Sequence, residues 1–189
     1  MADDNKVHYD LDDVHIAPLT LTGDKPTWGD PVRLYGAISM DLSAEGDTTK
    51  LRADGTDYYV SVANNGYTGD LSVAMVPDWF KAECLGHKIT ATDKVLVENA
   101  DIEPKPFAVL FRFKGDKHAR RHVLYNCVAA RPNIKGENKD NPKDPDTESL
   151  SLTASPLPNG WVKASTTAET PEAVYTNWNN AVWFNDKEA

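Results

Sequence analysis

Apolar and polar residues alternate with a period of two along most of this chain, which is the pattern of a β-strand with one buried face. The clearest alternating runs are residues 32–42, 67–75, 107–114 and 148–155. Residues 121–129 are partly apolar on both faces, as in an inner strand that is covered on both sides. Weaker runs lie at residues 7–11, 14–21, 57–62, 95–98 and 161–164. The sequence therefore predicts an all-β sandwich or barrel, with Gly36 bending the strand at 32–42.

Helix signals are few and short. Residues 77–85 place Pro77 at the first helical position and Gly86 at the C-cap. Residues 171–178 are expected to form a second short helix with Thr170 as its N-cap. The predicted fold is thus dominated by β-structure, with one or two short flanking helices.

Composition excludes several classes of function. Lys and Arg number 20 and Asp and Glu 29, so the net charge is −9. This sign argues against a dedicated nucleic-acid-binding domain and against a polybasic membrane-surface protein. No apolar run is long enough for a membrane-spanning helix, and residues 1–6 show no secretory signal. Cys84 and Cys127 are expected to be reduced and buried, with a single bridge as the alternative, so we expect a protein that folds in a cytoplasm.

The sequence carries no catalytic motif and no convincing metal site. His118 and His122 are four residues apart but lack a third ligand, so a solvated basic turn is the simpler interpretation. Prolines and lysines interrupt the acidic residues Asp140, Asp144, Asp146 and Glu148, unlike a calcium loop. Residues 135–147 are expected to be an exposed loop, and we expect neither a cofactor nor an enzymatic activity.

Eight stretches stand out in order along the chain. They are NKVHYDLDDVH at 5–15, LSAEGDTT at 42–49, NNGYTGDL at 64–71, PDWF at 77–80, KPFAVLF at 105–111, RHVLYNC at 121–127, SLTASP at 151–156 and AVYTNWNNAV at 173–182. In this order and spacing they resemble the major tail proteins of long, flexible, non-contractile-tailed phages of Gram-positive bacteria. The charged, proline-rich segment 135–147 is the visible departure from that family.

The resemblance implies a structural function. Such proteins are tail tube subunits with a β-sandwich and a flanking helix, and related folds occur in contractile-tail tubes and the type VI secretion tube. Six copies form a ring whose inner sheets join into one barrel, and stacked rings conduct DNA into the host. The resemblance also implies that residues 1–189 are one tail-tube domain, assembled in the bacterial cytoplasm and located in the virion. The implied partners are further copies, a tape measure protein, a tail terminator and a distal tail protein, with no membrane.

Three of the predicted strands have faces suited to the bore of such a tube. A bore that passes DNA needs small, polar, non-basic side chains, because Lys or Arg would hold the phosphates. The candidate lumen residues are Ser39, Asp41, Thr68, Asp70, Ser72, Ser149, Ser151 and Thr153. The alternative is that they form the ordinary solvent face of a monomeric sandwich.

Residues 43–56 form an extended loop or hairpin that is a candidate contact between rings. The candidate residues are Glu45, Asp47, Lys50, Leu51, Arg52 and Asp54. A mobile hairpin tip is the alternative. Six copies at −9 each give a ring charge of −54, so we expect salt to favour stacking.

A second hypothesis is a monomeric β-sandwich that binds carbohydrate or a cell surface through exposed tryptophans. The five candidates are Trp28, Trp79, Trp161, Trp178 and Trp183. Three of these lie within residues 161–183, which favours a packing role for the C-terminal segment.

Overall fold

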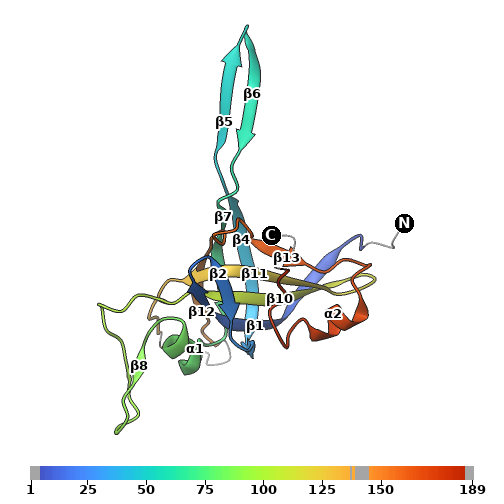
Figure 1. Ribbon diagram of the computed structural model, residues 1–189. Helices are drawn as coiled ribbons and strands as arrows, with labels where there is room; N and C mark the ends of the chain where they lie inside the picture. Colours follow the sequence, from blue (N-terminus) through green and yellow to red (C-terminus); the bar gives the residue numbers. More distant parts are fainter. Residues whose placement is uncertain (1–4, 137, 139–144, 186–189) are drawn as a thin grey trace.

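The computed structural model describes residues 5–136, 138 and 145–185. Nine strands form one antiparallel sheet in the order β2-β1-β10-β11-β12-β7-β4, with β3 paired to β1 and β13 paired to β11 (Figure 1). Its strands are β1 (His8–Thr22), β2 (Lys25–Trp28), β3 (Val32–Arg33), β4 (Ala37–Glu45), β7 (Gly66–Val73), β10 (Phe107–Gly115), β11 (Arg120–Ala129), β12 (Glu148–Ala154) and β13 (Lys163–Ser165). Two hairpins stand apart, β5 (Thr48–Ala53) with β6 (Thr56–Val62) and β8 (Lys88–Ile89) with β9 (Leu96–Val97). With two short helices, this confirms the predicted all-β fold.

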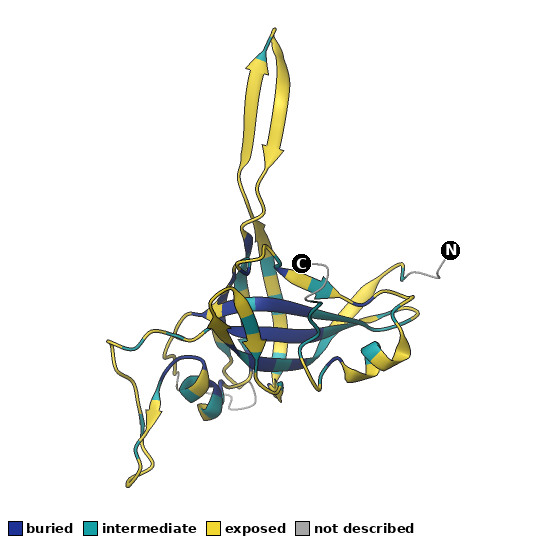
Figure 2. Cartoon of the chain, viewed as in Figure 1, coloured by how far each residue is buried: buried dark blue, intermediate teal, exposed yellow. Residues whose placement is uncertain are grey.

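The sheet encloses one hydrophobic core and carries a second on its outer face. Figure 2 shows that the buried residues gather on the central strands of the sheet. Strand β10 lies between the two cores. Its side chains alternate, so Phe107 and Val109 point into the inner core and Ala108 and Leu110 into the outer one. This is why the strand is apolar on both faces. The outer core is closed by the C-terminal segment, where Trp178 is buried and stacks on Trp183. Both cysteines are free and buried in the inner core, as expected.

Both helices are shorter than predicted, and their caps differ. Helix α1 (Asp78–Glu83) begins after Pro77, which is its N-cap rather than its first helical residue. Helix α2 (Glu172–Asn177) has Pro171 as its N-cap, so the prediction of Thr170 was wrong. The Thr170 hydroxyl instead accepts a hydrogen bond from the Thr167 N–H at 2.8 Å, which closes a local turn before the helix.

The run at 32–42 is two strands rather than one long strand. Gly36 has φ of +80° and turns the chain, so that β3 pairs with β1 while β4 pairs with β7. A register shift between Ala37 and Ser39 then leaves Ile38 52% exposed, although the alternation predicted it to be buried.

The weak alternating runs predicted at residues 7–11 and 14–21 are parts of one continuous strand, β1. Two register shifts interrupt its pairing with β10, and Asp10 and Asp13 have positive φ there. Between them Asp12 accepts two hydrogen bonds from the Arg112 guanidinium, at 2.6 and 2.8 Å, which fixes the end of β1 against β10. The predicted exposed loop at 135–147 includes residues 137 and 139–144, among them Asp140 and Asp144, which lie outside the described residues.

Candidate functional site

The sheet register brings all eight candidate lumen residues onto one continuous surface. Strands β4, β7 and β12 are neighbours, and their outward residues align in rows across the three strands. The rows are Ser39, Ser72 and Ser149; Asp41, Asp70 and Ser151; and Ser43, Thr68 and Thr153. We call these nine residues the polar face. Sequence reasoning identified its members, and the pairing adds Ser43 to them.

The polar face is acidic and carries no basic side chain. Asp41 and Asp70 lie directly opposite each other, and within the described residues neither carboxylate has an ion-pair partner. The hydroxyls of Ser149 and Ser151 donate to Asp70 at 3.4 and 2.7 Å. Since like charges on paired strands repel, these hydroxyls offset part of the cost of placing two carboxylates together.

The reverse side of the same three strands is the wall of the inner core. Leu71 and Leu150, which alternate with the residues of the polar face, are fully buried there. Gly69 allows β7 and β4 to approach closely, because a Cβ at this position would overlap the carbonyl oxygen of Asp41. The polar face is therefore backed by close packing of the inner core.

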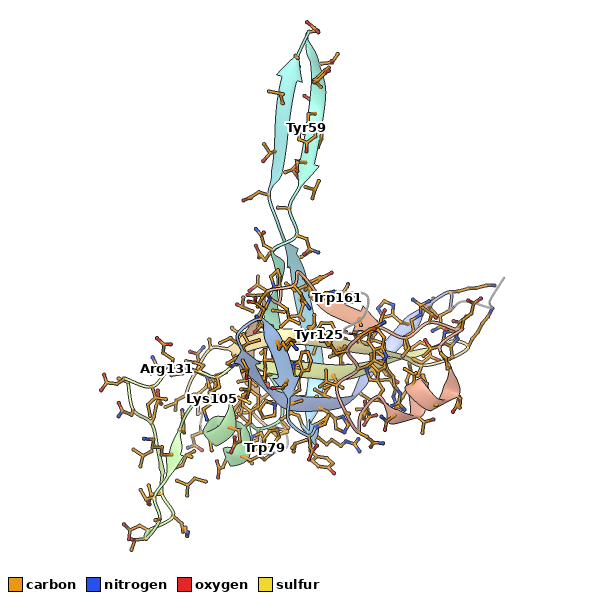
Figure 3. The ribbon with its side chains drawn as sticks, viewed as in Figure 1. Tyr59, Trp79, Lys105, Tyr125, Arg131 and Trp161 are labelled. Atoms are coloured by element: carbon orange, nitrogen blue, oxygen red, sulfur yellow. The ribbon has the colours of Figure 1, made fainter. Side chains whose placement is uncertain are left out.

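The β5–β6 hairpin projects away from the body of the protein, as a continuation of β4 and β7 (Figures 1 and 3). Its turn is the dipeptide Asp54-Gly55, whose φ values of +53° and +79° are those of a two-residue hairpin turn. The segment proposed from the sequence, 43–56, covers the end of β4, strand β5 and this turn, but it leaves out all of β6 after Thr56. The Asp-Gly pair between alternating residues is the sequence signal that locates the whole hairpin.

The structure places the candidate inter-ring residues along the first half of this projection, from the end of β4 through β5 to the turn. Glu45 ends β4, Asp47 lies in the link to β5, and Asp54 occupies the turn. On β5, Lys50 and Arg52 both contact Asp57 of β6, at 3.1 and 3.4 Å, so their charge is partly paired within the hairpin itself. Leu51 lies opposite Tyr59 and both are exposed.

Strand β6 is the part of the hairpin that sequence reasoning did not single out as a contact. All seven of its residues are exposed, and Tyr58 and Val62 are 73% and 72% exposed. Val60 and Val62 alternate with the polar Ser61, which is the pattern of a strand with one buried face. Within the described part of the single chain nothing buries that face, so β6 has the composition of an interface strand.

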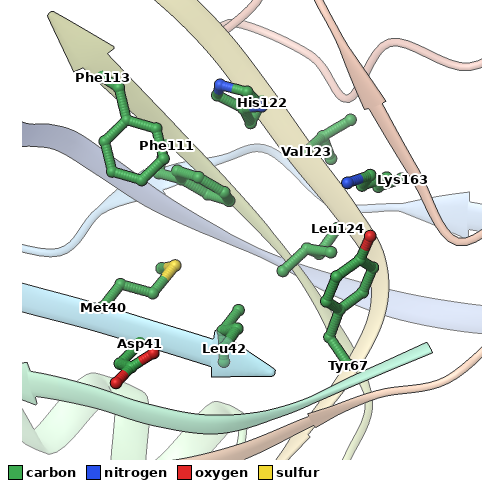
Figure 4. Close-up of a pocket in the computed structure, with 10 residues that line it drawn as sticks. All are labelled: Met40, Asp41, Leu42, Tyr67, Phe111, Phe113, His122, Val123, Leu124 and Lys163. Atoms are coloured by element: carbon green, nitrogen blue, oxygen red, sulfur yellow. The ribbon is translucent and has the colours of Figure 1, made fainter. Parts of the chain in front are cut away.

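A cavity of about 300 Å³ opens beside β4, between that strand and the strands β10, β11 and β13 (Figure 4). Its walls are mostly apolar, with Met40 and Leu42 on one side and Phe111 and Leu124 on the other. The Lys163 ammonium lies at its rim, 4.7 Å from the centre of the Tyr67 ring. The cavity thus lies along the strand that ends the nine-stranded sheet.

His122 lies on the cavity wall instead of in a solvated turn, which corrects the sequence interpretation. Its imidazole stacks on Phe111 with the ring centres 5.1 Å apart and meets the edge of Phe113. Burial lowers the pKa of His122 to about 4, with smaller contributions from the charges of Lys163, Arg120 and His8. The ring is therefore neutral at neutral pH. No group of metal ligands occurs among the described residues, His118 and His122 included.

His122 predicts a loss of stability in mild acid. Its pKa is lower in the folded than in the unfolded chain, so its neutral form stabilises the fold above about pH 6.5, and this contribution is lost as the pH falls towards 4. Between pH 7 and 4 this effect should lower the free energy of unfolding by about 2 kcal/mol, allowing for the partial exposure of His122 to solvent, and we expect His122→Phe to abolish it. Urea unfolding of both proteins between pH 7 and 4 measures it. Parallel stability curves for the two proteins would contradict the assignment.

The five tryptophans do not form an exposed binding surface. Trp178 is buried, and the other four are half-buried. Trp28, Trp161 and Trp183 pack on the outer core and Trp79 on the inner one. The indole N–H of Trp28 donates to the Tyr125 carbonyl and that of Trp178 to the His122 carbonyl. These tryptophans are therefore packing residues, and this includes the C-terminal group, as predicted.

No protein-family model matches this sequence, and a search of curated proteins finds no matching sequence. Among solved structures, the chain is similar to the crystal structure of Hcp1 from Salmonella typhimurium, with 11% identity over 83% of this chain and 96% of that one. The TM-score is 0.33, and a similarity of this size supports no functional argument. In the described part of the chain, no helix is long and apolar enough to cross a membrane.

Proposed function

We propose that this chain is the tail tube subunit of a long, non-contractile-tailed phage. Six copies form a ring, and the polar face of each copy lines the bore through which DNA passes. The observation that carries the proposal is the polar face itself, which is continuous over three strands, carries two unpaired carboxylates and has no Lys or Arg.

The chemistry of this face suits transient passage of DNA. Each Lys or Arg that neutralised a phosphate would release counterions and hold the DNA, so a basic bore would retain its cargo. Asp41 and Asp70 repel phosphates instead, and the short serine and threonine hydroxyls leave the surface smooth and hydrated. Fully buried leucines pack against the back of this wall.

The projecting hairpin supports the stacking of rings. A two-stranded hairpin is marginally stable in water, and one with this many exposed apolar residues is better explained by a partner surface than by a free tip. In the proposed tube, the hairpin of one ring contacts the next ring. The proposal includes assembly in the host cytoplasm, location in the virion, and end partners of the tape measure, terminator and distal tail protein classes.

The charge of the rings predicts how salt affects assembly. Six copies at −9 each carry a charge of −54, so neighbouring rings repel one another. Salt weakens this repulsion, because at physiological ionic strength charges are screened over about 8 Å. Light scattering and sedimentation velocity across a salt series at fixed protein concentration are expected to show larger assemblies as salt rises. Scattering that falls with salt would mean that contacts between opposite charges dominate the stacking, against the proposal.

A further inference from the structure

Two exposed apolar side chains lie at the end of the β4–β7 strand pair that is opposite the projecting hairpin. The hairpin continues one end of this pair (Figure 1). At the other end the pairing extends by one more residue on each side, because the Ala74 N–H donates to the Gly36 carbonyl at 2.8 Å. The next residues along the two segments, Tyr35 and Met75, are 73% and 69% exposed. This end of the pair thus presents apolar surface to solvent in the single chain.

Arg33 adds a positive charge to this surface. Its guanidinium lies 5.0 Å from the centre of the Tyr35 ring, and its side chain is 51% exposed. Its contact with the Asp13 carboxylate is long, at 3.9 Å. We call Arg33, Tyr35 and Met75 the end patch. Aromatic residues, Met and Arg are the residue types that are enriched in protein interfaces, so the end patch has the composition of a contact surface.

The base of the β5–β6 hairpin is complementary to the end patch. Val62 is exposed there, and so are the carboxylates of Glu45 and Asp47. Among the described residues, neither carboxylate has an ion-pair partner. The hairpin base therefore offers an apolar side chain beside negative charge, and the end patch offers apolar side chains beside positive charge. An exposed ion pair adds little affinity, but it selects one orientation of the two surfaces.

The lengths of the strands place the base of the hairpin, and not its tip, at the end patch of a stacked copy. A strand rises about 3.3 Å per residue, so the nine residues of β4 span ~30 Å and residues 46–54 extend the hairpin by another ~30 Å. A tube wall without gaps requires the bodies of adjacent rings to touch, which brings the hairpin base level with the end patch. A contact through the tip alone would leave the bodies ~30 Å apart. Residues 49–61 then lie along the body of the next copy and supply the larger part of the contact.

We propose that the end patch of one copy receives the base of the β5–β6 hairpin from a copy in the adjacent ring, with Val62 against Tyr35 and Met75. Arg33 then faces the carboxylates of the hairpin base. Because hairpin and end patch lie at opposite ends of one strand pair, each copy gives one contact and receives another, and the contact repeats along one axis. It does not use the outer edge of β4, which the ring needs to join its inner sheets. The inference rests on the proposed tube for its geometry and names the receptor of the hairpin.

Photo-cross-linking of the assembled full-length protein tests the contact. Val62→p-benzoylphenylalanine places a photoreactive ring at the hairpin base, where the native side chain is exposed. We expect mass spectrometry to find cross-links to residues 33–35 or 75. Within one chain these residues are separated from the hairpin base by ~30 Å, the length of β4, so such a cross-link must join two copies. Thr56→p-benzoylphenylalanine, beside the hairpin turn, is the control and is expected to give none of these products.

The cross-linked products separate this inference from the proposed function. Cross-links from position 62 to other surfaces only, or equal yields at the end patch from positions 62 and 56, would overturn the inference. The same products from isolated single rings would place the contact within a ring and would also overturn it. Tubes without the cross-link to the end patch would leave the proposed function intact and reject this receptor. The cross-link in filaments without a bore would retain the receptor and reject the tube.

Substitution of the end patch tests the same contact without cross-linking. Tyr35→Asp with Met75→Asp changes side chains that are exposed in the single chain, so the fold is expected to be unchanged. The new carboxylates would meet Val62 and the acidic base of the hairpin, so we expect single rings and at least tenfold fewer stacked ones in sedimentation velocity. Tyr35→Phe with Met75→Leu keeps the surface apolar and is the matched control, expected to stack like the parent. Equal stacking by the two double variants would contradict the end patch as the receptor.

Discussion

Replacement of residues 49–61 by Asn-Gly is expected to abolish tube assembly and leave the body of the protein folded. Thr48 and Val62 are a cross-strand pair, and a two-residue Asn-Gly turn joins such a pair without strain. The removed residues lie outside both hydrophobic cores, so their loss is expected to leave the thermal midpoint unchanged within a few degrees. Electron microscopy and sedimentation of the variant should show monomers or single rings under conditions in which the parent protein forms tubes.

The control for this truncation is Asp54→Asn, which keeps the positive φ of the turn and the full hairpin. It is expected to form tubes like the parent. Normal tubes from the truncated protein would exclude the hairpin as the stacking contact, and the candidates Lys50, Leu51 and Arg52 would lose their proposed role. A clearly lower thermal midpoint of the truncated protein would show that the hairpin stabilises the body. The complete exposure of β6 argues against such a role.

Two adjacent residues of β12 are expected to differ sharply in their effect on stability. Leu150 is fully buried in the inner core and Ser151 is exposed on the polar face. Leu150→Ala should lower the free energy of unfolding by about 2–5 kcal/mol, because it removes buried apolar surface and leaves a cavity. Ser151→Ala loses one exposed hydrogen bond to Asp70 and should cost about 1 kcal/mol or less. Chemical denaturation of the two variants measures the difference.

Equal costs for Leu150→Ala and Ser151→Ala would contradict the orientation of β12 and therefore the composition of the polar face. A one-residue slip in register would exchange the two sides of the strand and reverse the order of the two effects. Both variants are informative before any assembly is observed, because they test the wall of the proposed bore in the single chain.

The sequence predicts the polar face well because a period of two assigns each residue to one side of a strand. In β12 the observed burial alternates residue by residue, and the serines and Thr153 are exposed as expected. The same rule explains β10, whose two apolar faces meet two different cores. What alternation does not supply is the order of strands. That β4, β7 and β12 are neighbours follows from pairings between residues as far apart as Tyr67 and Ala154.

Where a prediction was wrong, local backbone geometry or packing determined the structure instead of the alternation of apolar and polar residues. Gly36 divides one alternating run between two pairing partners, and the following register shift exposes Ile38. His122 looked like part of a charged turn, but packing between two phenylalanines determines its environment. Strand β6 was expected as a strand, yet its complete exposure could not be read from residues whose alternation normally signals burial. Such a mismatch between pattern and exposure is the mark of a surface completed by a partner.

The most direct test of the proposed function is negative-stain electron microscopy of the purified full-length protein, at low and high concentration and in moderate salt. The proposal predicts rings at low concentration and hollow tubes at high concentration, with six subunits in end-on averages. Compact monomers at every concentration and salt, or a closed dimer without a bore, would contradict it.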